Sequence, residues 1–421
     1  MNHCFQSANI LLPDFTKVDA HRWALVACDQ FTSEPEYWED AAAIVGDAPS
    51  TLRLFLPEAY LEQAADKIPE IQSTMKAYLS EVLCEHPESM IYVERTQSDG
   101  DIRHGLVLAI DLEAYDYTRG SSSLIRATEA TVLERIPPRV AIRRGADIEL
   151  PHVMLLIDDP RRTVLEPLRG GTGKIAYDTP LMKKGGHIRG RFLTKDEKSH
   201  VTHTLSALIA PEEIEARYGD ASLAPLLFAV GDGNHSLASA KAAYEEIKAA
   251  IGAEAAMSHP ARYALCEVVN IHDEALKFEP IYRVMFGVDP DDLLSGLRAY
   301  ANALNGTAQK QTVLCRYGDK EETIVFENPV LQLTVGTLQT YLDDYLAHHP
   351  EASVDYIHGE SSVAALSAKE NAVGFLFGGM EKSDLFRTVI FDGALPRKTF
   401  SMGHAEDKRY YLECRRITPT T

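Results

Sequence analysis

The sequence predicts a protein of the α/β or α+β class, with mixed sheets flanked by helices. Short apolar runs typical of buried strands alternate with amphipathic stretches of helical period along the 421 residues. One apolar run, residues 224–230, passes through a glycine-rich turn directly into a helical stretch. No shift in composition marks a linker, and we place a soft boundary near residue 290. It separates a main α/β lobe, residues 1–290, from a C-terminal α/β lobe, residues 291–421.

Each element follows from a local pattern. Residues 22–28 form an apolar run that predicts a buried strand. The next stretch predicts a helix, because Ser33 and Glu36 have the spacing of a capping box with Pro35 in the first turn. Residues 90–112 predict a hairpin with its turn at 98–100. The other predictions are helices at 57–83, 234–251, 289–304 and 338–350, strands at 152–159 and 224–230, and a glycine-rich loop or ribbon at 169–192.

Composition limits the class of partner. The formal charge at pH 7 is −20, from 42 basic and 62 acidic residues, which disfavours nucleic acid and anionic membranes as partners. No apolar run approaches the roughly 18 residues of a membrane span. The six cysteines show no C-x-x-C spacing, which is typical of reduced intracellular thiols. We expect a cytoplasmic protein with a small-molecule substrate; the sequence leaves its oligomeric state open.

The stretch GDGNHS, residues 231–236, links the strand at 224–230 to the following helix. A helix N-terminus presents unpaired N–H groups and a partial positive charge, so it favours a bound anion such as phosphate. Gly231 and Gly233 allow positive φ and close approach of a ligand, and Asn234 or Ser236 can cap the first turn. The junction therefore predicts a phosphate-binding loop.

Asp232 and His235 lie within this loop. A carboxylate beside an anion site is useful if it binds a metal, here Mg²⁺, or accepts a proton. The alternative is that Asp232 is only the helix N-cap and His235 only a first-turn residue. Whether His235 acts chemically or orients a phosphate is left open.

The segment GDGNHSLASAK resembles the D-G-H-H-R signature of free serine kinases, which belong to the ParB and sulfiredoxin-like superfamily. It also resembles a broad bacterial and archaeal family of unknown function, with chains of this length. The resemblance implies a ParB/sulfiredoxin-like kinase core with large insertions, a nucleotide or pyrophosphate as co-substrate, and Mg²⁺. By motif position, Asp232 takes the place of the important Asp, and Gly233, Asn234 and His235 form the phosphate cradle. Because Ser236 replaces the Arg of the signature, the donor stays open between ATP, ADP and pyrophosphate.

The segment CDQFTSEPEYW, residues 28–38, resembles the kinase segment that carries a Glu proposed as the base for the substrate hydroxyl. We assign this role to Glu34, because Glu36 belongs to the predicted capping box, with Asp29 in support. The alternative interpretation is that these acids only favour the start of a helix.

The segment LPRKTFSMGHAEDKRYY, residues 395–411, groups cations and hydroxyls that can bind a phosphate or carboxylate. It resembles the P-K-T-T-R-H segment of free serine kinases. A polar turn near 358–360 can line the site, and the charged stretch 126–135 resembles an element of the family of unknown function. The candidates are Arg397, Lys398, Thr399, Ser401 and His404 for anion binding, with His358, Glu360 and Glu129 as supporting residues.

Together these patterns predict a Mg²⁺-dependent phosphotransferase acting on a small hydroxyl metabolite, with free L-serine as the first acceptor to consider. A nucleotide-binding, ParB-like regulatory module without kinase activity is one alternative. A metal-dependent hydrolase using the same acids is another. Fold likeness alone does not decide between them.

Overall fold

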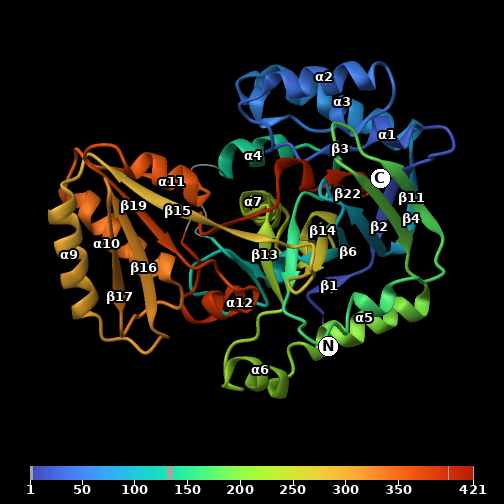
Figure 1. Cartoon of the computed structure of the whole chain (residues 1–421). Helices are drawn as coiled ribbons and strands as arrows, with labels where there is room; N and C mark the ends of the chain where they lie inside the picture. Colours follow the sequence, from blue (N-terminus) through green and yellow to red (C-terminus); the bar gives the residue numbers. More distant parts are fainter. Residues whose placement is uncertain (1–2, 130–135, 397, 421) are drawn as a thin grey trace. The chain divides into compact units, whose positions relative to one another are not determined.

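The computed structural model describes residues 3–129, 136–396 and 398–420 and divides the chain into two compact units (Figure 1). The second unit contains Thr128–Ala130 and Lys277–Gly403. The first unit contains the rest, including the C-terminal segment His404–Thr421. The boundary between the units therefore falls at residues 276–277, whereas the amino-acid pattern suggested a boundary near residue 290. The end of the chain returns to the first unit.

The first unit is built on a ten-stranded mixed sheet in the order β11-β12-β5-β6-β14-β10-β13-β8-β7, with β1 paired to β6. The predicted hairpin at 90–112 is confirmed by the antiparallel pair β5–β6, and the predicted ribbon at 169–192 by β11–β12. The mixed α/β class is also confirmed. The strands are β1 Phe5–Gln6, β5 Ile91–Thr96, β6 Ile102–Asp111, β7 Tyr115–Asp116, β8 Ile125–Ala127, β10 Met154–Ile157, β11 Ile175–Pro180, β12 His187–Phe192, β13 Phe228–Asp232 and β14 Tyr263–Asn270.

Helix α7, Asn234–Ile251, packs against this sheet through the apolar face that its sequence predicts. Leu237, Ala240 and Tyr244 are buried in the main core, and Ile247 packs against it. Ile251, at the end of the same predicted face, is 45% exposed. Further helices of the unit are α3 Ala64–Glu81, α4 Ile136–Arg143, α5 Lys195–Ala207, α6 Pro211–Tyr218 and α8 Ala253–Ala256.

Two predictions at the N-terminal end are wrong. The run 22–28 is not one strand: Asp19 caps helix α1, Ala20–Trp23, by accepting from the His21 N–H, and only Leu25–Val26 forms strand β3. The capping box at Ser33 is also absent. Helix α2, Pro35–Val45, has Glu34 as its N-cap, so Pro35 begins the helix and Ser33 lies one residue too early to cap it.

Two smaller sheets complete the first unit. A four-stranded sheet has the order β4-β2-β22-β9, and a two-stranded sheet pairs β21 with β3. Both include strands from the C-terminal segment, which is how that segment is fixed to the first unit. The strands are β2 Ala8–Pro13, β4 Leu83–Ser89, β9 Ile148–Glu149, β21 Tyr410–Tyr411 and β22 Cys414–Arg416.

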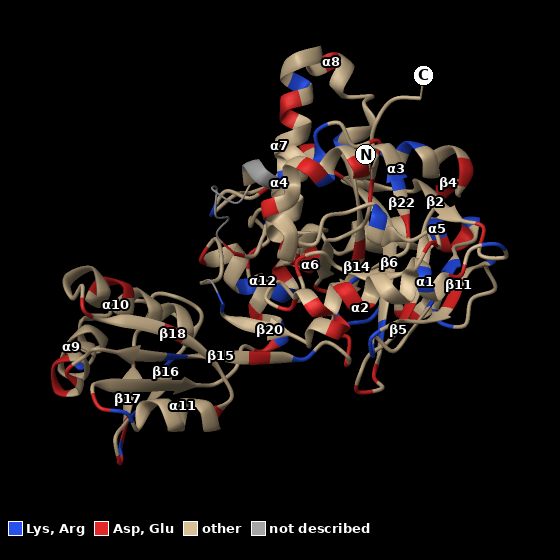
Figure 2. Ribbon diagram, turned by 90° about the horizontal axis from the view of Figure 1, so that it is seen from above, with Lys and Arg blue, Asp and Glu red and all other residues tan. Residues whose placement is uncertain are grey.

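The second unit is a six-stranded sheet in the order β17-β16-β19-β15-β18, with β20 paired to β15. Figure 2 shows α10 and α11 on opposite sides of this sheet. The strands are β15 Phe278–Phe286, β16 Gln311–Tyr317, β17 Lys320–Phe326, β18 Ser353–His358, β19 Ala372–Phe377 and β20 Phe400–Met402, and the helices are α9 Pro290–Ala303, α10 Thr334–His348, α11 Glu360–Ser367 and α12 Lys382–Phe391.

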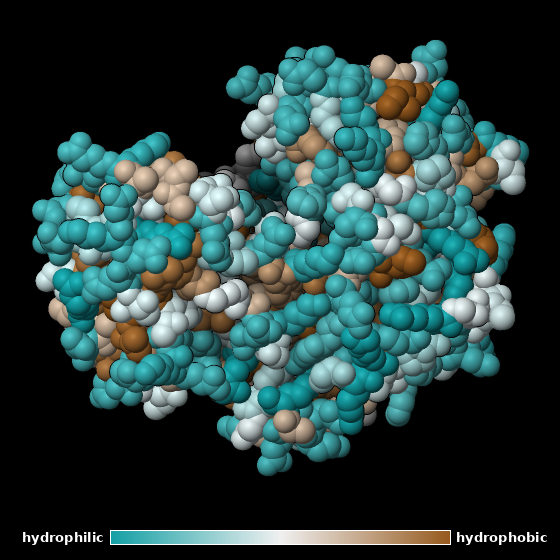
Figure 3. Space-filling model, in the orientation of Figure 1, coloured by the Kyte–Doolittle hydropathy of each residue, from teal (hydrophilic) through white to brown (hydrophobic). Residues whose placement is uncertain are grey.

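The surface carries both signs of charge. Figure 2 shows acidic and basic residues interspersed over both units, and the face in Figure 3 is hydrophilic over most of its area with small hydrophobic patches. In the described part of the chain, the helices are too short or too polar to cross a membrane. The six cysteines are all free thiols.

Candidate functional site

The start of α7 is built without a side-chain cap. Gly233, with φ of 85°, is the N-cap, and Asn234 is the first helical residue. The predicted caps at Asn234 and Ser236 are therefore wrong, and Asp232 is not the N-cap either. Instead, Asp232 Oδ1 accepts from the Gly233 N–H at 3.1 Å. The first turn thus begins with a glycine N-cap and a carboxylate beside it.

Gly233 is required here for two reasons. Its positive φ is a conformation that other residues rarely adopt. A Cβ at this position would also lie 3.0 Å from His152 Cδ2 and 3.2 Å from Val153 Cα. The register of the sheet explains this closeness: β13 runs antiparallel to β10, and Met154 pairs with Asp232. The residues just before β10 therefore lie beside the start of α7.

Lys408 forms an ion pair with Asp232. Its Nζ lies 3.3 Å from Asp232 Oδ2, and the two side chains are 17% and 26% exposed. Neighbouring residues fix the backbone of this lysine. Asp407 accepts from the Ser98 N–H at 2.7 Å, and the buried Arg409 pairs with Glu267 at 2.7 Å.

His152 and Asp29 form a second pair in the same region. Nε2 of His152 lies 3.2 Å from Asp29 Oδ2, and Gln30 donates to the other Asp29 oxygen at 2.8 Å. On the other side of the ring, Nδ1 lies 2.6 Å from the Tyr411 hydroxyl, whose oxygen also accepts from the Cys28 N–H at 3.2 Å. Both ring nitrogens of His152 therefore face oxygen atoms.

The pair is charged at neutral pH. Burial alone would raise the pKa of Asp29, but His152 lowers it below the usual carboxyl value, with further lowering from Gln30 and Lys408. Burial alone would lower the pKa of His152, but Tyr411 and the Asp29 carboxylate raise it well above its usual value. Lys408 thus acts electrostatically on both carboxylates, Asp29 and Asp232, and the site contains two Asp residues, a Lys and an imidazolium.

A cavity of about 160 Å³ adjoins this group. Its lining includes the polar residues Cys28, His152, Ser236, Ser239 and Tyr411 and the charged residues Glu58, Arg139, Arg143 and Glu149. Much of the remaining wall is apolar, with Leu54, Leu56, Leu61, Met75, Ile142 and Leu150 among its residues.

Of the predicted loop residues, Gly231 and Asp232 end β13, while Asn234, His235 and Ser236 occupy the first turn of α7 and are half-buried. Gly231 packs closely on Leu156, where a Cβ would lie 2.8 Å from Cγ. Glu34 is exposed, and its side chain makes no hydrogen bond or ion pair within the described residues. The structure thus brings Asp29, not Glu34, into contact with the other charged groups.

The predicted anion-binding segment is divided between the units. His404 belongs to the first unit, as the N-cap of a short helix at Ala405–Asp407. In the second unit, Lys398 lies over the Tyr356 ring at 4.9 Å, and the Thr399 hydroxyl donates to the Pro396 carbonyl at 2.6 Å. Ser401 lies in β20. Arg397 lies outside the described residues.

The predicted supporting residues of the second unit lie at element ends. His358 ends β18 and is exposed. Glu360 begins α11 and accepts from the Tyr282 hydroxyl at 3.4 Å. Glu129 forms an isolated bridge with Leu395.

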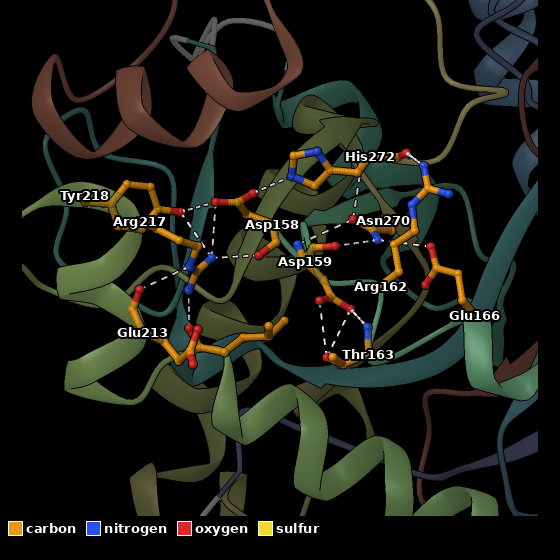
Figure 4. Close-up of polar contacts among 11 residues, drawn as sticks. Asp158, Asp159, Arg162, Thr163, Glu166, Glu213, Arg217, Tyr218, Asn270 and His272 are labelled. Carbon is orange, nitrogen blue, oxygen red and sulfur yellow. Dashed lines mark hydrogen bonds and ion pairs between the residues drawn. The ribbon is translucent and has the colours of Figure 1, made fainter.

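A separate polar cluster follows the other end of β10 and connects it to α6 and β14 (Figure 4). Asp158 accepts from the Tyr218 hydroxyl at 2.6 Å and from Arg217 at 3.1 Å, and it lies 2.7 Å from His272 Nε2. Burial would raise the pKa of Asp158, but His272, Tyr218 and Arg217 lower it. Since these groups bond mainly to one another, the cluster anchors the fold.

Sequence reasoning missed four residues at the site: Cys28, His152, Lys408 and Tyr411. A usable signal existed for three of them. Lys408 and Tyr411 belong to the cation-rich segment 395–411, and Cys28 directly precedes Asp29. His152 begins the predicted strand at 152–159, where a single His gives no signal by itself.

Comparisons with known proteins give one family. A family model described as "Protein of unknown function (DUF1015)" matches residues 13–375. No curated protein matches significantly. Similar solved structures include a conserved hypothetical protein from Pyrococcus furiosus, with 11% identity, a TM-score of 0.33, and 70% of this chain and 90% of that chain covered.

Two further structures are similar to the chain. Free serine kinase in complex with AMP has 10% identity and a TM-score of 0.34, with 74% of this chain and 91% of that chain covered. SbnI with a C-terminal truncation, from Staphylococcus aureus, has 12% identity and a TM-score of 0.33, with 70% and 82% covered. The family match, which spans most of the sequence, confirms the predicted membership: the chain belongs to the DUF1015 family.

Proposed function

We propose that the protein is a Mg²⁺-dependent phosphotransferase that acts on a small hydroxyl metabolite, with ATP, ADP or pyrophosphate as donor. Free L-serine is the first acceptor to test. The observation that carries the proposal is the pair at the start of α7, where Lys408 Nζ lies 3.3 Å from Asp232 Oδ2. A cation, a carboxylate and a helix N-terminus in one place suit phosphoryl transfer.

The positive groups would hold the donor. The N-terminus of α7 carries a partial positive charge, and Lys408 adds a full one. The imidazolium of His152, which is held charged by Asp29, adds another. Charge spreads over the oxygens of a transferring phosphoryl group, and these groups would offset it.

The carboxylates would serve the acceptor and the metal. We assign Asp29, in place of Glu34, as the group that orients the acceptor hydroxyl and accepts its proton. The pKa of Asp29 is lowered, which makes it a weak base. A weak base suffices because phosphoryl transfer depends mainly on positioning and electrostatic stabilisation. His235 and Ser236 remain candidates for contacts with the donor phosphates.

The donor set at the start of α7 fits Mg²⁺. This ion prefers oxygen ligands and commonly binds one or two carboxylates together with substrate phosphates. Asp232 would be its carboxylate ligand, and substrate phosphates would supply the other oxygens, because the described residues contain no group of three or more His, Cys, Asp or Glu side chains that could hold a metal ion. When bound with the donor, Mg²⁺ supplies positive charge to the phosphates.

We retain Lys398, in the second unit, as a separate anion-binding candidate. Lys398→Gln would weaken the binding of inorganic phosphate to the second unit, as measured by calorimetry.

A product screen tests the proposal. The wild type is incubated with Mg²⁺, each of the three donors and a panel of free amino acids, and phosphorylated products are detected by mass spectrometry. We expect a product that is lost in Asp232→Asn. A donor that binds without forming any product would favour the regulatory module, and release of phosphate without an acceptor would favour a hydrolase.

Two matched variants decide between the carboxylates. Asp29→Asn and Glu34→Gln each remove one negative charge. If Asp29 serves the acceptor, Asp29→Asn lowers kcat about 100-fold or more, and Glu34→Gln leaves it nearly unchanged. The reverse pattern would restore Glu34 as the base.

A further inference from the structure

The cavity beside His152 is lined by polar and apolar side chains. Cys28, His152, Ser236, Ser239 and Tyr411 are among the polar ones, and Cys28, His152 and Tyr411 contact one another around the imidazole ring. Apolar side chains form much of the lining. A ligand bound here would place one polar group near His152 and an apolar body away from it.

The apolar wall comes from four separate segments of the first unit. Leu54, Leu56 and Leu61 precede α3, Met75 lies on α3, Ile142 lies on α4, and Leu150 follows β9. These side chains meet at the cavity although they are far apart in sequence. Such a convergent apolar wall next to reactive groups is typical of a substrate site.

The charged residues on this wall are paired with each other. Arg139 forms an ion pair with Glu58, and Arg143 pairs with Glu149 at 2.5 Å. Their charges are therefore largely balanced within the protein. This wall is better suited to an uncharged group than to a second phosphate or carboxylate.

We infer that the cavity binds a compact apolar group on the acceptor, so that the cognate acceptor is a hydroxyl compound with about six carbons in a ring or branched chain. The inference rests on the proposed function for the role of the hydroxyl. The cavity measures about 160 Å³, and an apolar cavity of about 150 Å³ holds one benzene molecule. Free L-serine has a single CH₂ group in its side chain and would leave the apolar wall uncovered.

Ser239 offers a way to fill the cavity. It lies on α7, is 4% exposed, and its hydroxyl donates to the His235 carbonyl at 2.7 Å. Ser239→Leu adds apolar volume, and Ser239→Ala is the matched control because it removes the hydroxyl without filling space. Ala146→Leu fills the cavity from another side, since Ala146 also lines it and is 5% exposed. Thermal unfolding identifies variants that remain folded.

The test measures binding of benzyl alcohol to the full chain by saturation-transfer NMR, with L-serine as the comparison probe. We expect benzyl alcohol to bind to the wild type and Ser239→Ala, and to bind about tenfold or more weakly to a folded filling variant. No binding to the wild type, or equal binding to the wild type and the folded filling variants, would overturn the inference. The inference would be supported if the folded filling variants bind L-serine as well as the wild type does.

Donor binding is measured on the same samples by calorimetry. Asp232→Asn should weaken donor binding and leave benzyl alcohol binding unchanged. If no donor binds to the wild type, the proposed function fails, while the benzyl alcohol measurements still decide whether the cavity binds an apolar group. The two failures are therefore distinguishable.

Discussion

Nε2 of His152 lies 3.2 Å from Oδ2 of Asp29, although the two residues are 123 positions apart in the chain. Each residue shifts the pKa of the other: Asp29 raises that of His152, and His152 lowers that of Asp29. The imidazole is therefore a cation at neutral pH. In the proposed mechanism it offsets phosphate charge and does not serve as a base.

This relationship is testable by NMR. Asp29→Asn removes the carboxylate, so the His152 pKa should fall by about one pH unit or more. The readout is the chemical shift of the His152 ring proton against pH, assigned with His152→Gln. Glu34→Gln is the control and should leave the titration unchanged. An unchanged His152 titration in Asp29→Asn would show that the pair is not formed in solution.

The left-handed Gly233 gives a prediction for stability. Gly233→Ala combines unfavourable φ with contacts to His152 and Val153, and we expect it to lower the free energy of unfolding by more than about 1 kcal/mol. Gly219 has nearly the same φ, 86°, but open space around its Cβ position. Gly219→Ala should therefore cost less than Gly233→Ala in urea denaturation. If both variants lose the same free energy of unfolding, His152 does not lie close to Gly233.

Asp158 gives a prediction for pH dependence. Its pKa is lowered in the folded state, so its stabilising effect is complete above the unfolded value of about 3.9 and is lost as pH falls through the folded pKa. We expect Asp158→Asn to lower the free energy of unfolding by about 2 to 4 kcal/mol at neutral pH. The difference from wild type should shrink as the solution is acidified below about pH 4. Denaturation curves at several pH values measure this difference in the free energy of unfolding. A difference that grows on acidification would contradict the lowered pKa of Asp158.

Local pattern predicted much of the secondary structure and part of the site. The hairpin at 90–112 and the helix from 234 follow from periodicity and turn residues, which act over a few positions. The strand predicted at 22–28 failed because Asp19 caps a short helix there, and tertiary packing then uses the apolar residues in both elements.

The rest of the site depends on contacts between distant segments. His152 lies beside Gly233 only because β10 and β13 pair antiparallel with Met154 opposite Asp232. Lys408 reaches Asp232 only because the C-terminal segment returns to the first unit, where β21 pairs with β3. Neither pairing has a local signal, so the motif predicted a role for Asp232 but could not predict its ion pair with Lys408.

The rate of phosphoryl transfer in Asp232→Asn tests the central claim most directly. Asp220→Asn, the same substitution at an exposed loop residue, is the control. With labelled donor, Mg²⁺ and the acceptor found by the product screen, we expect Asp232→Asn to lose about 100-fold or more in kcat while its unfolding transition stays close to that of wild type. Equal rates in wild type, Asp232→Asn and Asp220→Asn, or no transfer by wild type with any donor, would contradict the account.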